Sequence, residues 1–220
     1  MDTFQLRFVC TANLCRSPLA ERIAVLRVPH ATTRWLAVSS AGTHARDGMR
    51  MHPPAARHLG GVGADPAGFR SRRLTAAMVA GDDLVLTADL AQRDAVVALC
   101  PAASRRTFMI KEFARLVRHP PVLLKRPASW PPGGAAPGTA AGCERAEAAR
   151  EMVAHAARYR GRVPWCEPVL DEIADPDGTD AAVASCAEQI DLAVTEIVLF
   201  LAGPTPPPAS PTMRAADSRS

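Results

Sequence analysis

A cysteine and an arginine stand six residues apart near the start of the chain, in the stretch FVCTANLCRSPLAER at residues 8–22. Cys10 follows an apolar segment. Arg16 directly precedes Ser17 and Pro18, which predict a helix with the Ser17 hydroxyl at its N-cap and Pro18 at its first position. A short loop between a strand end and a helix N-terminus can turn its backbone N–H groups inward and bind an oxyanion of the phosphate type. Arg16 could then clasp two oxygens of that anion. The same positive field would favour the thiolate of Cys10, which is the form that attacks phosphorus.

The rest of the chain has to supply a strand and a helix that hold this loop. Apolar segments that predict strands alternate with segments that predict helices. Strands are expected at 4–9 (ending at Cys10), 35–39, 84–87 and 107–110, and helices from Ser17 to before Pro29, from 53 to about 60, from about 75, and at 90–99 and 111–117. This alternation predicts an α/β fold, namely a four-stranded parallel sheet with helices on both faces in a Rossmann-like three-layer sandwich.

The second half of the chain changes in composition. Residues 119–142 are rich in Pro, Gly and Ala and predict a flexible insertion loop, while helical composition returns at 144–158. An acidic, loop-like stretch then precedes a long helix with Val183, Ala187, Ile190, Val194, Ile197 and Leu201 on one face. We expect one domain over 1–202 and a disordered, Pro- and Ser-rich tail at 203–220.

Composition and cysteine spacing narrow the function classes. The 220-residue chain is 48% hydrophobic and carries a net charge of only +4, which does not call for a nucleic-acid partner. Its six cysteines form no CxxC pair and no zinc-finger spacing, and its six histidines form no metal-ligand pattern, so no metal and no cofactor is expected. No apolar run approaches a membrane span and no signal peptide is visible. The expectation is a cytoplasmic protein, monomeric and without a membrane partner.

The opening stretch resembles the signature of the low-molecular-weight protein tyrosine phosphatases. The residues that match it are Cys10, Asn13, Cys15, Arg16, Ser17 and Pro18. Three later stretches are similar to further family segments in the right order: SSAGTHA at 39–45, GFRSRRLT at 68–75 and DEIADPDG at 171–178. The resemblance covers about residues 4–202.

The resemblance implies a site and a reaction. Cys10 would form a phosphocysteine intermediate, Arg16 would clamp the phosphate, and Asp175, held by Pro176, would be the general acid, with Asp177 and Asp180 as rival carboxylates. The phosphate-binding loop would consist of Thr11, Ala12, Asn13, Leu14, Cys15, Arg16 and Ser17. Asn13 would take a left-handed backbone, with Ser17 and Ser40 as its hydrogen-bond partners. The substrate would be a phosphorylated protein, expected to carry phosphotyrosine, or a small phosphomonoester.

The chain departs from the family pattern at four positions. Ala12 stands where Gly is usual, which requires a negative φ there. Phe69 stands in place of a His and removes one anchor of Asn13. Asp177 and Arg46 stand where aromatic side chains would stack on a phenyl ring, so phosphatase chemistry is more firmly implied than phosphotyrosine specificity.

Alternatives stay open at this point. A thioredoxin-coupled arsenate reductase shares the Cys-to-Arg loop but needs two further relay cysteines, and Cys100 has no close partner in sequence while Cys143, Cys166 and Cys186 are scattered. A non-catalytic phosphate-binding module is the second alternative. Cys15 is either a partner that forms a disulfide with oxidised Cys10 or a small side chain buried behind the loop.

Overall fold

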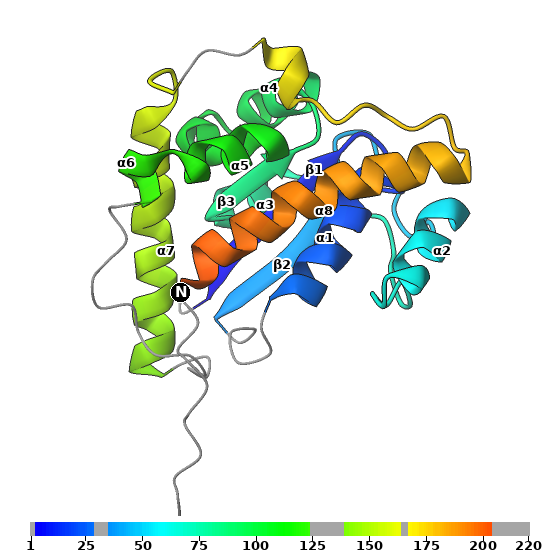
Figure 1. Ribbon diagram of the computed structural model, residues 1–220, viewed down its shortest axis with the longest axis horizontal. Helices are drawn as coiled ribbons and strands as arrows, with labels where there is room; N and C mark the ends of the chain where they lie inside the picture. Colours follow the sequence, from blue (N-terminus) through cyan, green and yellow to red (C-terminus); the bar gives the residue numbers. More distant parts are fainter. Residues whose placement is uncertain (1–2, 29–34, 124–138, 164–166, 204–220) are drawn as a thin grey trace, which may run out of the picture.

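The computed structural model describes residues 3–28, 35–123, 139–163 and 167–203, and its centre is one parallel sheet (Figure 1). The strands are β1 (Phe4–Cys10), β2 (Leu36–Gly42), β3 (Leu84–Thr87) and β4 (Thr107–Met109), in the order β2-β1-β3-β4. Every neighbouring pair is parallel. The predicted four-stranded parallel sheet is therefore confirmed.

Helices connect the strands and cover the sheet. They are α1 (Arg16–Arg27), α2 (Pro53–Gly61), α3 (Ala76–Gly81), α4 (Leu90–Leu99), α5 (Ile110–Arg118), α6 (Pro120–Leu123), α7 (Ala140–Tyr159) and α8 (Asp180–Ala202). Two 3₁₀ turns, η2 (Pro101–Arg106) and η3 (Pro168–Asp171), complete the described elements. None of the helices in the described ranges is long and apolar enough to span a bilayer.

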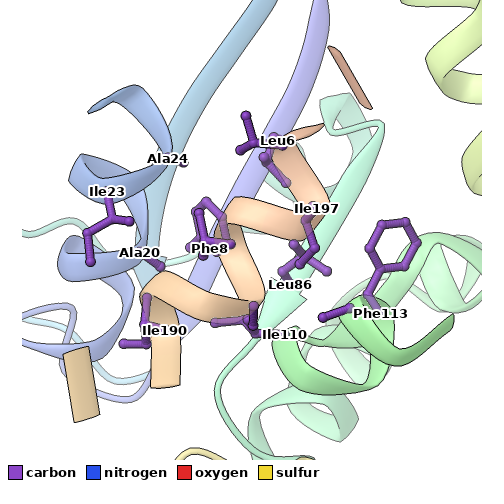
Figure 2. Packing of buried hydrophobic residues seen from close by; sticks show 14 of the residues in the cluster. Leu6, Phe8, Ala20, Ile23, Ala24, Leu86, Ile110, Phe113, Ile190 and Ile197 are labelled. Atoms are coloured by element: carbon purple, nitrogen blue, oxygen red, sulfur yellow. The ribbon is translucent and has the colours of Figure 1, made fainter. Parts of the chain in front are cut away.

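The two-residue period of the strands sends side chains to two separate cores. Leu6 and Phe8 of β1 are fully buried on the face covered by α1, α5 and α8. Figure 2 shows this face, with α8 laid across the sheet and its Ile190 and Ile197 directed at the strands. Val9 points the other way, into a smaller cluster that includes residues of α3 and α4. Helices thus cover both faces, as predicted.

The long helix α8 follows its sequence pattern closely. The six apolar residues predicted to share one face, Val183, Ala187, Ile190, Val194, Ile197 and Leu201, are all 0% exposed. Helix α8 packs chiefly on α1 and α5. This packing holds α1, and therefore the loop that precedes it, against the sheet.

Several predicted boundaries were wrong in detail. The second strand continues through Ser40 to Gly42, because it pairs with β1 along its full length, ending at Cys10 opposite Gly42. The expected insertion loop is helical at both ends: α6 begins at Pro120, and α7 begins at Ala140 with the Thr139 side chain as its cap. Its middle, 124–138, lies outside the described residues, as does the predicted tail beyond Gly203.

Strand β1 lies between β2 and β3, so its carboxyl end is the switch point of the sheet, where ligands bind in open α/β folds. Gly42 allows the end of β2 to approach the loop there. A Cβ on Gly42 would lie 2.6 Å from the Thr11 carbonyl oxygen and 2.8 Å from the Asn13 nitrogen. The amide of Thr43 also donates to the Cys10 carbonyl at 2.9 Å. Only glycine permits this close contact between strand and loop.

Candidate active site

The loop between β1 and α1 curls around the Cys10 thiol. Cys10 is 3% exposed, at the end of β1. The Asn13 amide donates to Cys10 Sγ at 3.3 Å, and Ser17 Oγ lies 3.0 Å from the same sulfur. Backbone and hydroxyl donors of this kind stabilise a negative sulfur. The structure therefore places Cys10 where a thiolate is supported by its own loop.

Asn13 is the residue that fixes the shape of the loop. It is the only non-glycine residue with positive φ in the described ranges, at 55°, and its side chain is fully buried. Its side-chain nitrogen, Nδ2, donates to Ser17 Oγ at 3.0 Å and to Ser40 Oγ at 2.9 Å. Its side-chain oxygen, Oδ1, accepts from the Arg72 backbone amide at 2.9 Å. Both predicted serine partners are in place.

Two departures from the family pattern have simple structural outcomes. Ala12 does not take a positive φ, which is the condition under which its methyl group is tolerated. Phe69 is buried in the main core and cannot hydrogen-bond Asn13. The Arg72 backbone amide satisfies the Asn13 oxygen. Ser40 in turn donates to the buried carboxylate of Glu21 on α1, a partner that sequence reasoning missed.

Ser17 does not cap the helix, contrary to the prediction. Helix α1 begins at Arg16, with Cys15 at the N-cap position and no side-chain cap. The Ser17 hydroxyl is instead used by Cys10, Asn13 and the Ala41 carbonyl, 3.3 Å away. Pro18 still lies in the first turn, where a backbone N–H is not required. The open amide groups of this turn remain free to face an anion.

Arg16 is held over the loop by acceptors from two distant segments. Its Nη1 donates to Asp89 Oδ2 at 2.9 Å and to the Ile173 carbonyl at 3.2 Å. Its Nε lies 3.0 Å from Asp175 Oδ1, an ion pair outside hydrogen-bond geometry, so Nε makes no hydrogen bond. The Arg16 side chain is 5% exposed. A buried cation with a donor still available is suited to an anionic ligand.

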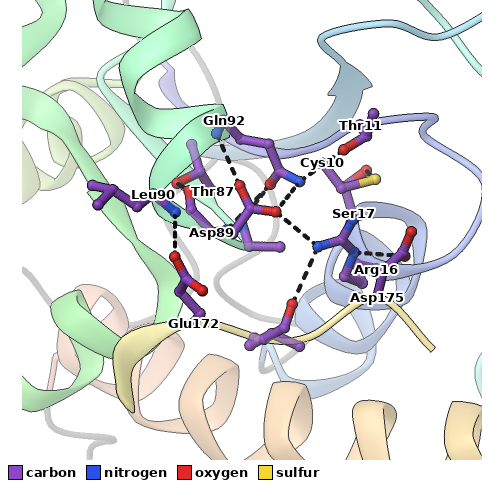
Figure 3. A network of polar contacts seen from close by, with 12 residues as sticks. Cys10, Thr11, Arg16, Ser17, Thr87, Asp89, Leu90, Gln92, Glu172 and Asp175 are labelled. Atoms are coloured by element: carbon purple, nitrogen blue, oxygen red, sulfur yellow. Dashed lines mark hydrogen bonds and ion pairs between the residues drawn. The ribbon is translucent and has the colours of Figure 1, made fainter. Parts of the chain in front are cut away.

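Asp89 and Gln92 form a support for the site that sequence reasoning missed (Figure 3). Asp89 caps α4 in a reciprocal capping box with Gln92. Gln92 is 3% exposed, and its side-chain amide donates to Asp89 Oδ2 at 2.6 Å and to Thr11 Oγ1 at 3.1 Å. One network therefore connects the loop, the helix α4 and Arg16. The signal was available in the sequence, since Asp-x-x-Gln after an expected strand is a capping-box pattern.

The segment that carries Asp175 is tied to α4 and α5 just before it reaches the loop. The Ile173 amide donates to the Ala88 carbonyl at 2.8 Å, and the Leu90 amide donates to Glu172 Oε1 at 3.3 Å. Lys111 donates to the Glu172 carbonyl at 3.1 Å. The Asp175 side chain itself is 71% exposed. The anchors fix the base of the segment, while the carboxyl group extends over the loop.

A cavity of about 260 Å³ lies between the loop and this segment. Its lining brings together Cys10, Ala12, Leu14, Cys15 and Arg16 with Asp175, Pro176, Asp177 and Gly178. Of the other predicted loop residues, Asn13 and Ser17 are buried supports, and Thr11 contacts Gln92. Arg46 does not line the cavity, whereas Asp177 does and has its carboxylate engaged by the Thr179 amide and hydroxyl, which lower its pKa.

His52 also lines the cavity. Its ring lies near Gly178, so that a Cβ there would be 3.5 Å from its Cε1, and its backbone amide donates to the Leu14 carbonyl at 2.8 Å. His52 thus contacts both the loop and the Asp175 segment.

The second loop thiol, Cys15, is partly buried and is flanked by Cys186 of α8. Burial, followed by the charges of Cys186 and Cys10, raises the pKa of Cys15 to about 12, and burial raises that of Cys186 to about 11. Both therefore remain protonated near neutral pH. Cys10, Cys15, Cys100 and Cys186 are free thiols. A disulfide between oxidised Cys10 and Cys15 stays a prediction.

No group of three or more His, Cys, Asp or Glu residues in the described part of the chain is arranged to hold a metal ion. The arrangement around Cys10 consists of a thiol nucleophile, an anion-binding loop, a guanidinium and a carboxyl group. Chemically, it can bind a phosphate group, attack it at phosphorus and exchange a proton with the leaving oxygen.

Comparison with solved structures supports the same fold. The low molecular weight protein tyrosine phosphatase from T. tengcongensis superposes with a TM-score of 0.60 at 22% identity, over 89% of this chain and 98% of the other. The YwlE arginine phosphatase from Geobacillus stearothermophilus gives a TM-score of 0.58 at 20% identity, over 89% and 90%. At this identity the likeness shows the α/β fold.

Sequence comparison identifies the family. Etp of Escherichia coli strain K12, a low molecular weight protein-tyrosine-phosphatase, is 33% identical over 117 residues, which are 50% of this chain and 74% of Etp. A protein-arginine-phosphatase of Geobacillus stearothermophilus is 30% identical over 110 residues, 50% of this chain and 71% of that protein. The sequence model described as low molecular weight phosphotyrosine protein phosphatase matches residues 5–127. The chain therefore belongs to the low molecular weight phosphotyrosine protein phosphatase family.

Proposed function

We propose that this protein hydrolyses phosphomonoesters through a phosphocysteine intermediate on Cys10. The observation that carries the proposal is the single cavity in which the Cys10 sulfur, the Arg16 guanidinium and the Asp175 carboxyl group meet. Cys10 and Arg16 come from the two ends of the loop between β1 and α1, and Asp175 comes from the distant segment before α8. Their convergence at the switch point of the sheet is the arrangement that the reaction needs.

In the first step, the Cys10 thiolate attacks phosphorus while the bond from phosphorus to the ester oxygen breaks. The loop amides and Arg16 bind the three non-bridging oxygens as negative charge develops on them. Asp175, in its protonated form, gives its proton to the leaving oxygen, which departs as an alcohol or phenol. The phosphate is then linked to Sγ.

In the second step, water attacks the phosphocysteine. The Asp175 carboxylate takes a proton from that water, the phosphorus–sulfur bond breaks, and the electron pair returns to Cys10 as thiolate. Ser17 Oγ lies 3.0 Å from the sulfur, and its hydroxyl would turn from the Ala41 carbonyl to donate a hydrogen bond to the departing thiolate. Inorganic phosphate leaves, and the site returns to its starting state.

We propose phosphotyrosine in a protein or peptide as the substrate. The cavity of about 260 Å³ is below the usual range of roughly 300–1,000 Å³ for small-molecule sites, which suits one phosphorylated side chain rather than a whole metabolite. Leu14 and Pro176 offer apolar surface to an aromatic ring at its wall. Etp, whose name specifies tyrosine, is among the relatives.

Phosphoarginine in a protein is the second candidate. Asp177 lines the cavity beside Asp175 at a position where an aromatic wall was expected. Two carboxyl groups at the rim favour a cationic guanidinium leaving group over a neutral phenol. One relative is a protein-arginine-phosphatase.

The activity is tested by hydrolysis of p-nitrophenyl phosphate at mildly acidic pH. Wild type is expected to be active and Cys10→Ser inactive. Asp175→Ala should be reduced by about 10²–10⁴-fold, because the water that attacks the phosphocysteine loses its general base. Asp180→Ala, an exposed carboxyl group at the start of α8, is the control and should keep its activity. An inactive wild type, or an active Cys10→Ser, would refute the proposal.

Substrate class is decided separately with peptides that carry phosphotyrosine, phosphoarginine or phosphoserine. The primary proposal predicts the highest kcat/KM for phosphotyrosine. Preference for phosphoarginine, lost in Asp177→Ala, would establish the second candidate instead. Reduction of arsenate with thioredoxin, in place of hydrolysis, would favour the reductase considered from the sequence.

A further inference from the structure

A second and larger cavity lies at the opposite end of the strands from Cys10. It has a volume of about 690 Å³ and is lined by the end of α3, by η2 and by α7; we refer to it as the α3–α7 cavity. Asp82 and Asp83 in its wall directly precede β3, and Arg106 directly precedes β4. These are the amino ends of the strands, whereas Cys10 ends β1. Figure 1 shows α7 on the side of the molecule that lies far from α2.

Arginines dominate the charged wall of this cavity. It contains the four guanidinium groups of Arg105, Arg106, Arg150 and Arg158, against two carboxylates. A positive excess in a concave site raises the local concentration of anions.

The two carboxylates are already engaged by cations. Asp82 pairs with the buried Arg7 at 2.6 Å, and Asp83 pairs with Arg150 at 2.8 Å and accepts from the Gln5 amide at 2.8 Å. Asp82 also lies close enough to Arg106 for their charges to interact, so the uncompensated guanidinium charge at the cavity is that of Arg105 and Arg158. Arg105 and Arg158 form no ion pair with any residue in the described ranges.

Arg106 is fixed at the wall by backbone acceptors. Its Nη1 donates to the Ala102 carbonyl at 3.2 Å, and its Nη2 donates to the Val79 carbonyl at 3.2 Å. Its Nε is buried and makes no hydrogen bond within the described structure. Arg106 is thus a fixed cation in the wall whose charge is partly offset by Asp82.

The remaining lining is apolar and small. Val153, Ala154 and Ala157 of α7 face Ala80 of α3 and Ala102 of η2 across the cavity. These short side chains leave the volume unfilled. An apolar floor under a guanidinium-rich mouth is complementary to a molecule that has an acidic head and an apolar body.

We propose that the α3–α7 cavity binds a small organic anion of this amphipathic kind. Its phosphate, sulfonate or carboxylate head would be held by Arg105 and Arg158, and its apolar body would lie against the Ala154 face of α7. The volume falls within the range of roughly 300–1,000 Å³ for small-molecule sites, unlike the smaller cavity at Cys10. The site does not depend on the proposed phosphatase reaction. The matched family segment, 5–127, ends before α7, so five of the twelve lining residues lie outside it.

Fluorescence titration of the full chain tests the proposal. The probes are 8-anilinonaphthalene-1-sulfonate, which is an apolar body with an anionic head, and the neutral N-phenyl-1-naphthylamine. Saturating orthophosphate is present throughout to occupy the Cys10 site. We expect the anionic probe to bind with a stoichiometry of one and more tightly than the neutral probe.

Two variants test the two halves of the site. The double variant Arg105→Gln/Arg158→Gln should bind the anionic probe about tenfold more weakly, the loss expected for charge-assisted contacts. Its affinity for the neutral probe should stay unchanged. Ala154→Phe should fill the cavity and abolish the binding of both probes. All three positions are exposed, so these variants should fold, and circular dichroism of each variant checks this.

Matched controls keep the result specific. Arg73→Gln removes one exposed charge beyond the other end of α3, and Ala98→Phe adds a ring to an exposed alanine of α4. Both should bind the anionic probe as the wild type does. The proposal is overturned if no probe binds, if both probes bind equally, or if the cavity variants bind as the controls do.

Discussion

At the scale of single residues, the site depends on carboxylates that orient its cation. Asp89 combines two roles, because it caps α4 and also accepts from Arg16 Nη1. A clamp works only if the guanidinium fork is held in the right plane before the anion arrives. Asp89 is in this sense a positioning residue, acting through Arg16.

Asp89→Asn separates the two roles, because asparagine caps helices as well as aspartate does. The change removes the negative charge facing Arg16, and kcat/KM is expected to fall by about 10- to 100-fold, as for loss of a hydrogen bond to a charged group. Inhibition by orthophosphate should weaken in parallel, while the thermal midpoint stays close to that of the wild type. Asp94→Asn, an exposed position on α4, is the control. Unchanged kinetics with lowered stability would mean that Asp89 is only a cap.

At Asn13, the effect of the left-handed backbone on stability can be measured separately from that of the side-chain hydrogen bonds. Asn13→Gly keeps the positive φ without strain but loses the contacts to Ser17, Ser40 and the Arg72 amide. Asn13→Ala loses the same contacts and adds about 1–2 kcal/mol of left-handed backbone strain. Urea unfolding should rank the wild type first, then the glycine variant, then the alanine variant. Equal stability of the two variants would show that the backbone is not strained, and a glycine variant as stable as the wild type would show that the contacts contribute nothing.

Residue types predicted part of this site well, and the reason is local. The left-handed backbone of Asn13 follows from what this residue type tolerates locally, whereas its partners Ser17 and Ser40 were implied by the family resemblance. The roles of Glu21 and Gln92 could not be found in that way, because each side chain acts across the fold, toward Ser40 and Thr11 respectively. Ser17 was assigned to a cap because the sequence does not show that Cys10 and Asn13 compete for its hydroxyl.

At the scale of elements, the segment between η3 and α8 is fixed at its base and turns on Gly178. The base is anchored by Ile173 and Glu172. Gly178 has a φ of +92°, and an added Cβ would meet His52 at an ordinary 3.5 Å. A substitution there is therefore limited by backbone strain and not by space. That strain acts three residues from Asp175.

Gly178→Ala is expected to shift this segment and impair proton donation by Asp175. A poor leaving group needs the proton, whereas p-nitrophenolate hardly does. The variant should therefore lose more activity toward phenyl phosphate than toward p-nitrophenyl phosphate. Gly63→Ala is the control, because Gly63 also has a positive φ, +80°, with no atom within 4 Å of the added Cβ, and lies after α2. Equal losses on both substrates would contradict a role for this segment in acid catalysis.

Element order was predictable because each strand and helix has its own pattern, whereas their ends depend on partners. The apolar stripe of α8 is fixed by a regular helical repeat. Strand β2 runs past its apolar residues to Gly42 because β1 offers partners that far. Helix α6 begins within a Pro-rich stretch whose composition is typical of a loop. It can form there because two prolines are compatible with a first helical turn.

At the scale of the whole molecule, a buried ion pair joins two segments that are 75 residues apart in the chain. Arg7 of β1 pairs with Asp82, which precedes β3, and the two are 9% and 4% exposed. Burial raises the pKa of Asp82 above its usual value, although the Arg7 hydrogen bond and charge act to lower it. Ionised Asp82 is therefore less favourable in the folded than in the unfolded state. The stabilising effect of its raised pKa is complete below the unfolded value, about 3.9, and is lost as pH rises through the folded value.

Arg7→Met removes the cation, raises the Asp82 pKa further and leaves a buried carboxylate without its partner at neutral pH. The free energy of unfolding should fall by about 3–5 kcal/mol near neutrality. That loss should shrink toward about pH 4, where the unfolded carboxyl group also takes up a proton. The double variant Arg7→Met/Asp82→Leu should recover most of the stability, because a packed apolar pair can replace a buried ion pair.

Urea unfolding at both pH values measures these differences. Arg57→Met is the control, since Arg57 and Asp180 are 60% and 70% exposed and their pair should contribute less than about 1 kcal/mol at either pH. A loss for Arg7→Met that stays constant with pH would show that the missing packing, and not the charge left on Asp82, destabilises the protein. A double variant as unstable as the single one would lead to the same conclusion. A smaller loss in acid together with recovery in the double variant would show that the charge of this pair must be balanced for the sheet to hold β1 beside β3.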